Sequence, residues 1–335
     1  MSNSADTKNE TLKFPSRFFD LYWGQSGSGK STAARDAIIQ MHKRTGQKAR
    51  VVIGDGSMAT YEPLIARGIV EPVEYAHRSW PEDVISRLSE GYFPADPNDP
   101  LAPLVEPKKQ PSFKDIGMYV FEGASMMATY MMSTVKGGLA ARAADGEKLG
   151  MDAAIRIFNG ELDKDGKLVD GPGTWSGGNS IPHYQFAQRT IEDAVQRSKG
   201  LAPYVIWTAH ESMNDPEKDK FVKEQIAGPE VIGKALLTKF QRVYNSCLHF
   251  QSVAKRQTSS DKDDFTGRTA QELKLDYRIW TRDHFTPDSN ILIRYRAVVR
   301  GIDEEDLQPF YPNIRAFYND LLVAQDKALD KLMAD

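Results

Sequence analysis

The chain of 335 residues is poor in cysteine and has no long hydrophobic run. Its one cysteine, Cys247, cannot form a disulfide within the chain, which is typical of a protein from a reducing compartment. The first residues are polar and lack the apolar core of a signal peptide. No run of about eighteen apolar residues, the length that spans a bilayer, is present. We therefore expect a cytoplasmic protein without a membrane segment.

The sequence also lacks a strong excess of charge of either sign. Its formal net charge is -3, from 43 Lys and Arg against 46 Asp and Glu, which excludes a generally basic coat for nucleic acid. Residues 234–300 differ, because they hold 13 basic and 7 acidic side chains, a local balance of +6. A stripe that binds the phosphates of nucleic acid would have such a local excess.

The segment "WGQSGSGKST", residues 23–32, matches the phosphate-loop pattern G-x-x-x-x-G-K-S from Gly24 to Ser31. An aromatic strand candidate, 16–23, precedes it, and helical spacing of Ala34, Ile38 and Met41 follows it. Strand, loop and helix form the context that such a motif needs. We expect ATP to be bound by Gly24, Gln25, Ser26, Gly27, Ser28, Gly29, Lys30, Ser31 and Thr32.

The residue types of this loop suit a triphosphate and its metal. Gly27 and Gly29 let backbone N–H groups converge on a phosphate, and the helix that follows adds its positive N-terminal end. Lys30 supplies a point charge, and Ser31 supplies a hydroxyl ligand for Mg²⁺. The glycines do not form G-x-G-x-x-G, so a dinucleotide fingerprint is excluded.

An acid at the end of a neighbouring strand normally holds the Mg²⁺ shell or activates water in such proteins. Glu122, at the end of "MYVFE", is the first candidate for either role, and Asp55, after "RVVIG", is the second. The alternatives are an acid at a helix N-terminus for Glu122 and a turn residue for Asp55. We expect the metal ligands among Ser31, Glu122 and Asp55.

A second buried strand, "YVIWTA", leads into His210 and Glu211. A polar residue at the tip of a central strand can sense the γ-phosphate, since ligands of α/β sheets lie at the carboxyl ends of strands. The alternative is a capping or turn residue at the edge of the sheet. The predicted catalytic residues are therefore Lys30, Glu122, His210 and Glu211.

Strands that alternate with helices predict an α/β fold with a mainly parallel sheet and helices on both faces. We expect a flexible tail at 1–13, one domain at 14–310 and a packed C-terminal helix at 311–335. A glycine-rich insertion at 134–181 holds 10 of the 25 glycines. The polar segment "KRQTSSDKDDFTGRTA", 255–270, is predicted to be a flexible loop.

Three arginines alternate along "ILIRYRAVVR", residues 291–300. If this segment is one strand, Arg294, Arg296 and Arg300 share a face and Tyr295 points into the core. They are candidates for arginine fingers that reach a neighbour's γ-phosphate, or for contacts with DNA. The alternative is a solvated strand face paired with acids.

Five segments occur in an order that resembles a known family: "YWGQSGSGKST", "YVFEGAS", "YVIWTAHES", "AGPEVIGKAL" and "ILIRYRAVVRG". Over about residues 16–322 the set resembles the phage-type AAA/RecA-like P-loop ATPases, phage nucleotide-binding proteins of which some accompany single-strand annealing in recombination. The resemblance implies a RecA-like core, ATP with Mg²⁺, single-stranded DNA as partner, a homo-oligomer, and the cytoplasm of the host cell. The process would be DNA recombination, replication or repair.

The resemblance also implies residue roles. Lys30 and Ser31 would bind ATP, Glu122 would take the Walker B role and His210 would be the sensor. The chain departs from the family in carrying Glu122 in place of Asp and in the glycine-rich insertion after Met132.

Two further functions stay open. A kinase of a nucleotide or small metabolite also uses such a phosphate loop, with Arg142 and Arg156 of the insertion as candidates for a lid. A structural protein that binds nucleotide without hydrolysing it is the other alternative. The motif "WSGGN", 175–179, follows Glu122 by too many residues to be the signature of a transporter ATPase.

Overall fold

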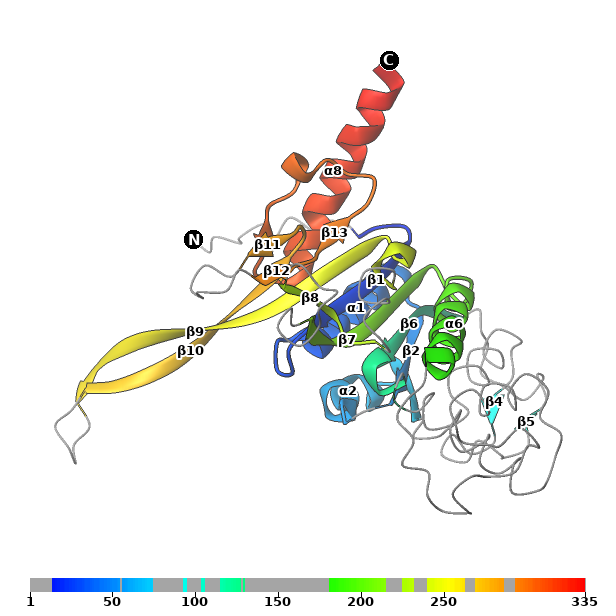
Figure 1. The fold of residues 1–335 in the computed structure, drawn as a ribbon, viewed down its shortest axis with the longest axis horizontal. Helices are drawn as coiled ribbons and strands as arrows, with labels where there is room; N and C mark the ends of the chain where they lie inside the picture. The colour runs from blue at the N-terminus through cyan, green and yellow to red at the C-terminus, as the bar shows by residue number, and fades with distance from the viewer. Residues whose placement is uncertain are drawn as a thin grey trace, which may run out of the picture.

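The computed structural model describes residues 14–54, 56–74, 93–94, 104–105, 115–127, 129, 181–214, 225–231, 240–262, 269–285 and 293–334. Outside these ranges lie the predicted tail 1–13, Asp55, and all of the predicted insertion 134–181 except residue 181. The described part confirms the predicted α/β class, with a mainly parallel central sheet, helices on its two faces and a C-terminal helix (Figure 1).

The central strands run parallel to one another. In spatial order they are β3 (Val70–Glu74), β2 (Lys48–Ile53), β6 (Ile116–Glu122), β7 (Tyr204–Asn214), β1 (Phe18–Gly24) and β9 (Ser246–Lys262). The remaining strands are β4 (Phe93–Pro94), β5 (Leu104–Val105), β8 (Gln225–Pro229), β10 (Thr269–Trp280), β11 (His284–Phe285), β12 (Ile293–Tyr295), β13 (Val298–Val299) and β14 (Phe310–Tyr311). The helices are α1 (Lys30–Thr45), α2 (Met58–Ile65), α6 (Ile181–Ser198), η3 (Phe240–Val243), η4 (Glu304–Asp306) and α8 (Ile314–Ala334).

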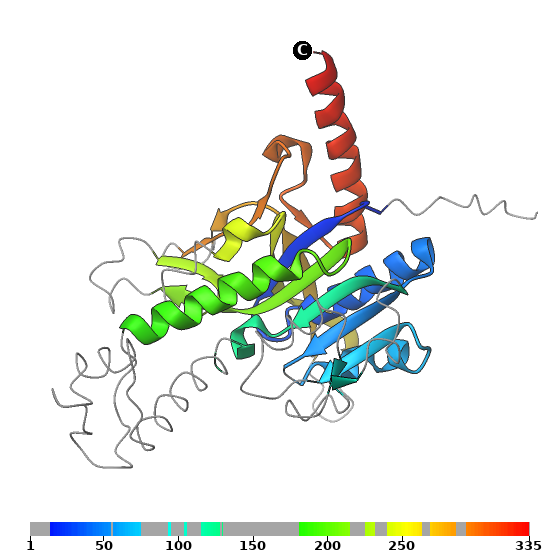
Figure 2. The same ribbon diagram turned by 90° about the vertical axis from the view of Figure 1, so that its right-hand side faces the viewer.

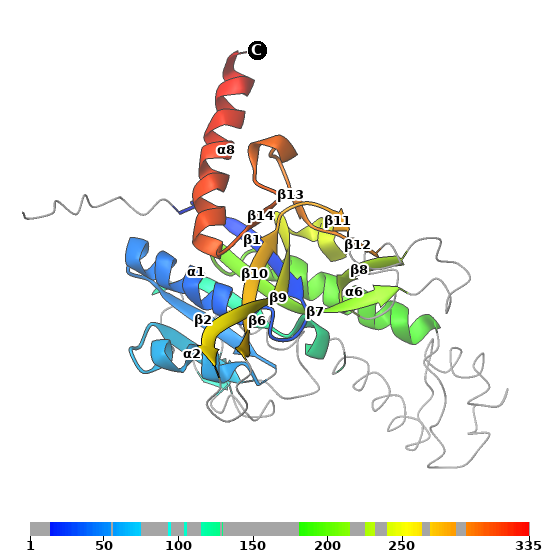
Figure 3. The ribbon, with the colours of Figure 1, turned by 90° about the vertical axis from the view of Figure 1, so that its left-hand side faces the viewer.

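Both faces of the central sheet are covered, as a parallel sheet requires. Side chains alternate along β1, so that Leu21 and Trp23 join the core cluster of α6, while Tyr22 joins that of α1, α2 and α8. Figures 2 and 3 show α6 on one face and α1 with α2 on the other. This two-sided burial explains why β1 and β6 are nearly continuous apolar runs in the sequence.

Strands β9 and β10 form a two-stranded arm that extends well beyond the rest of the sheet (Figure 1). Residues 255–262 and 269–270 belong to this arm, so the prediction of a flexible loop across 255–270 is wrong for them. The segment is polar and gives no strand pattern. A hairpin nevertheless satisfies its backbone N–H and C=O groups through its own partner strand, and it does not need apolar side chains to do so.

Helix α8 packs on the sheet with its first half only. Ile314, Phe317 and Leu321 are buried, which confirms the predicted packing there. Leu329 is 55% exposed and Met333 is 79% exposed, so the prediction of a packed helix over 311–335 is wrong for its second half. Figures 1 and 2 show this half standing clear of the domain. Within the described ranges, no helix is long and apolar enough to cross a membrane.

Candidate functional site: a phosphate loop facing a buried glutamate

The phosphate loop connects β1 to α1, in the context predicted from the sequence. A Cβ on Gly24 would lie 2.1 Å from the carbonyl oxygen of Phe250 on the neighbouring strand, so only glycine fits there. Gly29, the residue before α1, has a φ of +92°, which L side chains rarely adopt. The glycines of the motif are therefore required by the backbone path itself.

The loop presents polar groups to an open space. Lys30 is 8% exposed, and its Nζ donates to the carbonyls of Gly24 at 2.9 Å and Gln25 at 2.8 Å. The Oγ of Ser28 is buried and has no hydrogen-bond partner among the described residues. A Cβ on Gly27 would meet nothing within 4 Å. Together with the N-terminus of α1, whose helix dipole favours negative charge, these features fit an anionic ligand such as a triphosphate.

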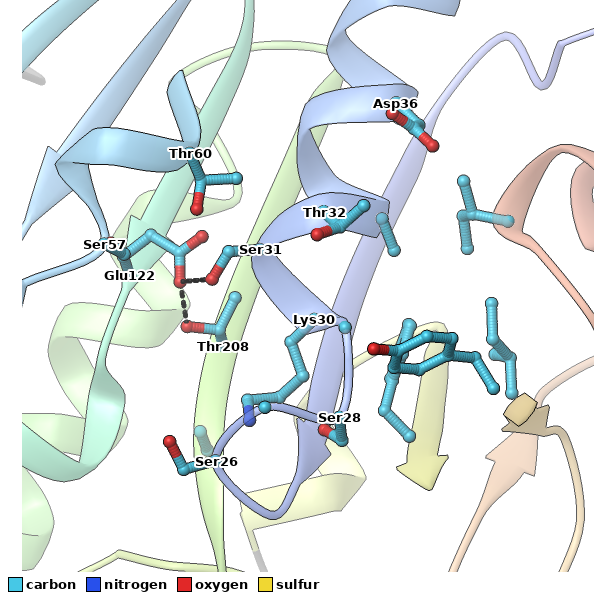
Figure 4. Close-up of a pocket in the computed structure, with 18 of the residues that line it drawn as sticks. Ser26, Ser28, Lys30, Ser31, Thr32, Asp36, Ser57, Thr60, Glu122 and Thr208 are labelled. Carbon is cyan, nitrogen blue, oxygen red and sulfur yellow. Dashed lines mark hydrogen bonds between the residues drawn. The ribbon is translucent and has the colours of Figure 1, made fainter. Parts of the chain in front are cut away.

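Glu122 ends β6 beside this loop and is only 1% exposed. Its Oε2 accepts hydrogen bonds from the Thr208 hydroxyl at 2.6 Å and the Ser31 hydroxyl at 3.4 Å (Figure 4). Its Oε1 accepts a short hydrogen bond from the Tyr61 hydroxyl of α2. Three hydroxyls from three elements thus hold one buried carboxylate next to the first turn of α1.

Strand β7 lies between β1 and β6 and aligns the two halves of the site. Thr208 of β7 donates to Glu122 and accepts from the backbone N–H of Gly123 at 2.9 Å. His210 lies opposite Gly24 in the β1–β7 register and lines the same cavity. The strand continues to Asn214, so His210 is not at its tip as the sequence suggested. Its sensor role stays a prediction.

Ser31 and Glu122 are suited to a small hard cation. Mg²⁺ prefers oxygen ligands, keeps several waters and is usually held by one or two protein groups together with substrate phosphates. A hydroxyl and a carboxylate 3.4 Å apart match that need. Among the described residues, no group of three His, Cys, Asp or Glu side chains could hold a metal by itself.

The cavity of about 760 Å³ extends to both sides of the loop. On one side lie Ser57, Thr60, Glu122 and Thr208 (Figure 4). The other side carries Asp36 and a mostly apolar set of side chains from β9, β10 and the start of α8. That set consists of Phe250, Tyr277, Ile279, Pro312, Asn313 and Ile314. The polar end of the cavity suits a metal ion, the phosphate loop suits a triphosphate, and the apolar end suits a base.

Glu211 lies outside the cavity, although it follows His210 directly. Its Oε2 accepts a hydrogen bond from His249 Nε2 at 3.1 Å, and His249 Nδ1 lies 3.2 Å from His284 Nε2. Burial lowers the pKa of His249, and burial together with His249 lowers the pKa of His284 to about 3. Both imidazoles are therefore neutral near pH 7, and His249 stacks on Trp23 with ring centroids 4.2 Å apart. This cluster supports the strand that leads into the phosphate loop.

The predicted arginine strand is wrong in part. The segment splits into β12, which pairs with β8 and β11, and β13, which pairs with β9, so the three arginines do not share one strand face. Arg294 forms an ion pair with Asp283 at 2.6 Å, and Arg300 donates to the carbonyl of Tyr244 at 3.0 Å. Arg296 is half-buried. None of the three is among the described residues that line the phosphate-loop cavity. Tyr295 is buried, as expected.

Sequence reasoning missed Tyr61, whose hydroxyl bonds to Glu122, and several described residues that line the cavity. Tyr61 lies on a helix without any motif, and Tyr277 lies on a strand next to a segment taken for a loop. Asp36 and Asn313 are ordinary helix and turn residues in the sequence. Only the fold brings these side chains to the phosphate loop. Asp55, the second predicted acid, lies outside the described residues.

A scan against models of protein families finds no match, and a search of curated proteins finds none. Among solved structures, the flagellar accessory protein FlaH of Methanocaldococcus jannaschii aligns with a TM-score of 0.34 and 8% identity, over 80% of this chain and 78% of that one. A KaiC-like protein of Pyrococcus horikoshii aligns with a TM-score of 0.32 and 10% identity, over 84% and 91%. Similarity at this level establishes no family and no function for this chain.

Proposed function

We propose that the protein is a Mg²⁺-dependent ATPase with a RecA-like core and that it binds ATP at the phosphate loop. The observation that carries the proposal is the 3.4 Å distance between the hydroxyl of Ser31 and the carboxylate of Glu122, at the N-terminus of α1. A phosphate loop binds a triphosphate, and an adjacent acid on a neighbouring strand is what hydrolysis adds to binding.

Each residue then has a role that its position allows. Lys30 and the N–H groups of the loop would bind the phosphates, and the Ser31 hydroxyl would be a ligand of Mg²⁺, which would neutralise phosphate charge when bound. The Glu122 carboxylate lies 3.4 Å from the Ser31 hydroxyl, so it would orient a water of the bound metal or accept a proton from an attacking water. Thr208 and Tyr61 hold that carboxylate in place.

The base and ribose take the apolar end of the cavity. Tyr277 lies against the loop, since its ring would be 3.4 Å from a Cβ on Gly29. Aromatic rings bind bases by stacking, and the neighbouring Ile279 and Ile314 exclude water. Asp36 and Asn313 offer polar atoms for the edge of the base or for the ribose.

The direct test measures ATP binding and phosphate release by the wild type and by Lys30→Ala. Loss of a charge-assisted contact of about 1.5–3 kcal/mol should weaken ATP binding at least about tenfold. Lys43→Ala, on the last turn of the same helix, is the matched control and should bind normally. Equal ATP affinity in Lys30→Ala and wild type would overturn the proposal.

A narrower function follows from the sequence resemblance. We propose that the ATPase serves phage DNA recombination, replication or repair, as a homo-oligomer that contacts single-stranded DNA. The support is the balance of +6 over residues 234–300, a segment that includes the β9–β10 arm. Fluorescence anisotropy with labelled single-stranded DNA, together with ATPase rates with and without DNA, tests it. Absence of both binding and stimulation would remove the DNA role and leave the ATPase.

The kinase alternative has one observation in its favour. Ser57 and Thr60 line the cavity near Glu122, where an acceptor molecule would have to lie. Product analysis separates the two functions, because an ATPase releases inorganic phosphate and a kinase transfers it to an added nucleoside or metabolite. The third alternative, nucleotide binding without turnover, predicts neither product.

A further inference from the structure

A second cavity, of about 410 Å³, lies at the end of β1 opposite the phosphate loop. Its floor is the start of β1 and β9, and its walls come from the turn after α6, from η3, from the end of β13 and from α8. The lining consists of Arg17, Phe18, Phe19, Asp20, Lys199, Val243, Asn245, Ser246, Val299, Arg300, Leu321 and Gln325. It shares none of its lining residues with the phosphate-loop cavity.

Three cationic side chains line this second cavity, and none forms an ion pair with a described residue. Arg300 is held by neutral groups, since its Nε donates to the carbonyl of Tyr244 at 3.0 Å and its Nη2 to that of Gln241 at 3.3 Å. Arg17 donates only to the carbonyl of Lys199, at 3.4 Å. The Lys199 ammonium lies over the Phe19 ring, 5.2 Å from its centre. All three retain N–H groups for a ligand.

One acid, Asp20, also lines the cavity and is fully buried. Its Oδ2 accepts a hydrogen bond of 2.9 Å from the Tyr318 hydroxyl of α8, and that hydroxyl lies 2.6 Å from the hydroxyl of Tyr22. Its Oδ1 has no hydrogen bond of good geometry with any described residue. Ser246 of β9 contacts this carboxyl with poorer geometry, so a ligand atom that bonded well to Oδ1 would stabilise the buried group.

We propose that this second cavity binds a small anion, a carboxylate or phosphate compound, between Arg17, Lys199 and Arg300 and beside Asp20. Three cations against one acid leave the lining with a charge of +2 when Asp20 is ionised and +3 when it is protonated, which favours an anion over a cation. The volume of about 410 Å³ far exceeds the ~30 Å³ of one water, so a metabolite fits as well as an inorganic ion.

The protonation state of Asp20 supports this role. Burial raises its pKa to about 7, against the smaller lowering effects of Tyr318 and Ser246. The charged or titratable groups around it are Tyr22 on β1, Cys247 on β9, Tyr318 on α8 and Arg300 after β13. Protonated Asp20 donates to an anion and ionised Asp20 repels it, so anion binding should be tighter at pH 6 than at pH 8.

The test is calorimetric titration of the full chain with inorganic phosphate and, separately, with succinate, at pH 6 and pH 8. Because the phosphate loop also binds phosphate, the titration uses Lys30→Ala, and in parallel the wild type saturated with a non-hydrolysable ATP analogue. One anion-binding site should remain both in Lys30→Ala and in the wild type saturated with the ATP analogue. Whichever anion binds more tightly identifies the ligand as a phosphate or a carboxylate compound.

Three variants decide the assignment. The double variant Arg17→Gln/Lys199→Gln should weaken the remaining site at least about tenfold, because two charge-assisted contacts are lost. The matched double variant Lys43→Gln/Lys331→Gln, with exposed lysines elsewhere, should not change it. Asp20→Asn, whose amide can still donate, should keep the affinity and lose the pH dependence. No remaining site, or a site that the Arg17/Lys199 double variant leaves unchanged, overturns the proposal.

Discussion

Ser31 and Glu122 are 91 positions apart in the sequence, and their side-chain oxygens lie 3.4 Å apart. Ser31 is in the first turn of α1 and Glu122 ends β6, so β7 alone separates their strands in the sheet. Thr208 of that intervening strand binds the same Oε2 of Glu122. The strand order therefore brings Glu122 next to the phosphate loop, where an acid is needed for hydrolysis.

Replacing Glu122 with Gln should keep ATP binding and slow phosphate release by about a hundredfold, since the amide can neither accept a proton nor balance the charge of a metal ion. Single-turnover hydrolysis and equilibrium binding of ATP separate the two effects. Glu211→Gln tests the rival acid, and Glu304→Gln, at an exposed acid outside the cavity, is the control. If Glu211→Gln alone slows turnover, the base role moves from Glu122 to Glu211.

Tyr61→Phe tests whether the hydroxyl from α2 positions Glu122. The substitution removes one hydrogen bond to Oε1 and keeps the buried ring, so the fold should survive. We expect kcat to fall about fivefold, which corresponds to the loss of one hydrogen bond of roughly 1 kcal/mol, with KM for ATP little changed. A change in KM with kcat intact would instead show that Tyr61 acts on nucleotide binding.

The sequence predicted the parts of the site that depend on local pattern. The phosphate loop, the helix after it and the strand that ends in Glu122 have their own motif, spacing or apolar run. Tyr277 and Asn313, which line the cavity, and Tyr61, which bonds to Glu122, could not be predicted, because their places depend on the packing of distant elements and on no local pattern.

The errors have physical causes as well. Polar strands in a hairpin are stabilised by backbone pairing, so the polar composition of 255–270 does not distinguish a strand from a flexible loop. The alternating arginines predict one strand, but the backbone leaves β12 after Tyr295 and joins a different neighbour at Val298. A change of partner strand within five residues leaves no trace in hydrophobic alternation.

Tyr277→Ala tests the apolar end of the cavity as the base site. Loss of stacking on a base, about 1–3 kcal/mol, should weaken ATP binding about tenfold. Tripolyphosphate, which has no base, should bind the variant and the wild type equally, and Tyr277→Phe should behave as wild type. Equal losses for ATP and tripolyphosphate would mean that Tyr277 acts on the phosphate loop beside Gly29 rather than on the base.

The last prediction concerns Asp20 and the pH dependence of folding. Burial raises its pKa from 3.8 in the unfolded chain to about 7 in the folded protein. Below pH 4 both states hold the proton, so the contribution of Asp20 to stability is fully present. Between pH 4 and 7 the unfolded chain releases the proton first, so this contribution falls as pH rises and is lost above pH 7. The total change is on the order of 4 kcal/mol.

The Asn side chain of Asp20→Asn cannot titrate, so the variant should lack this pH-dependent contribution to the free energy of unfolding. Urea unfolding of wild type and variant from pH 4 to 8, in buffer without phosphate or carboxylates, gives the difference between their free energies of unfolding at each pH. Relative to the variant, the wild type should lose stability steadily as the pH rises to 7 and change little beyond that. A difference that stays constant, or that grows in favour of the wild type, would show that Asp20 is ionised in the folded protein. Asp20 could then not donate to an anion in the second cavity at neutral pH.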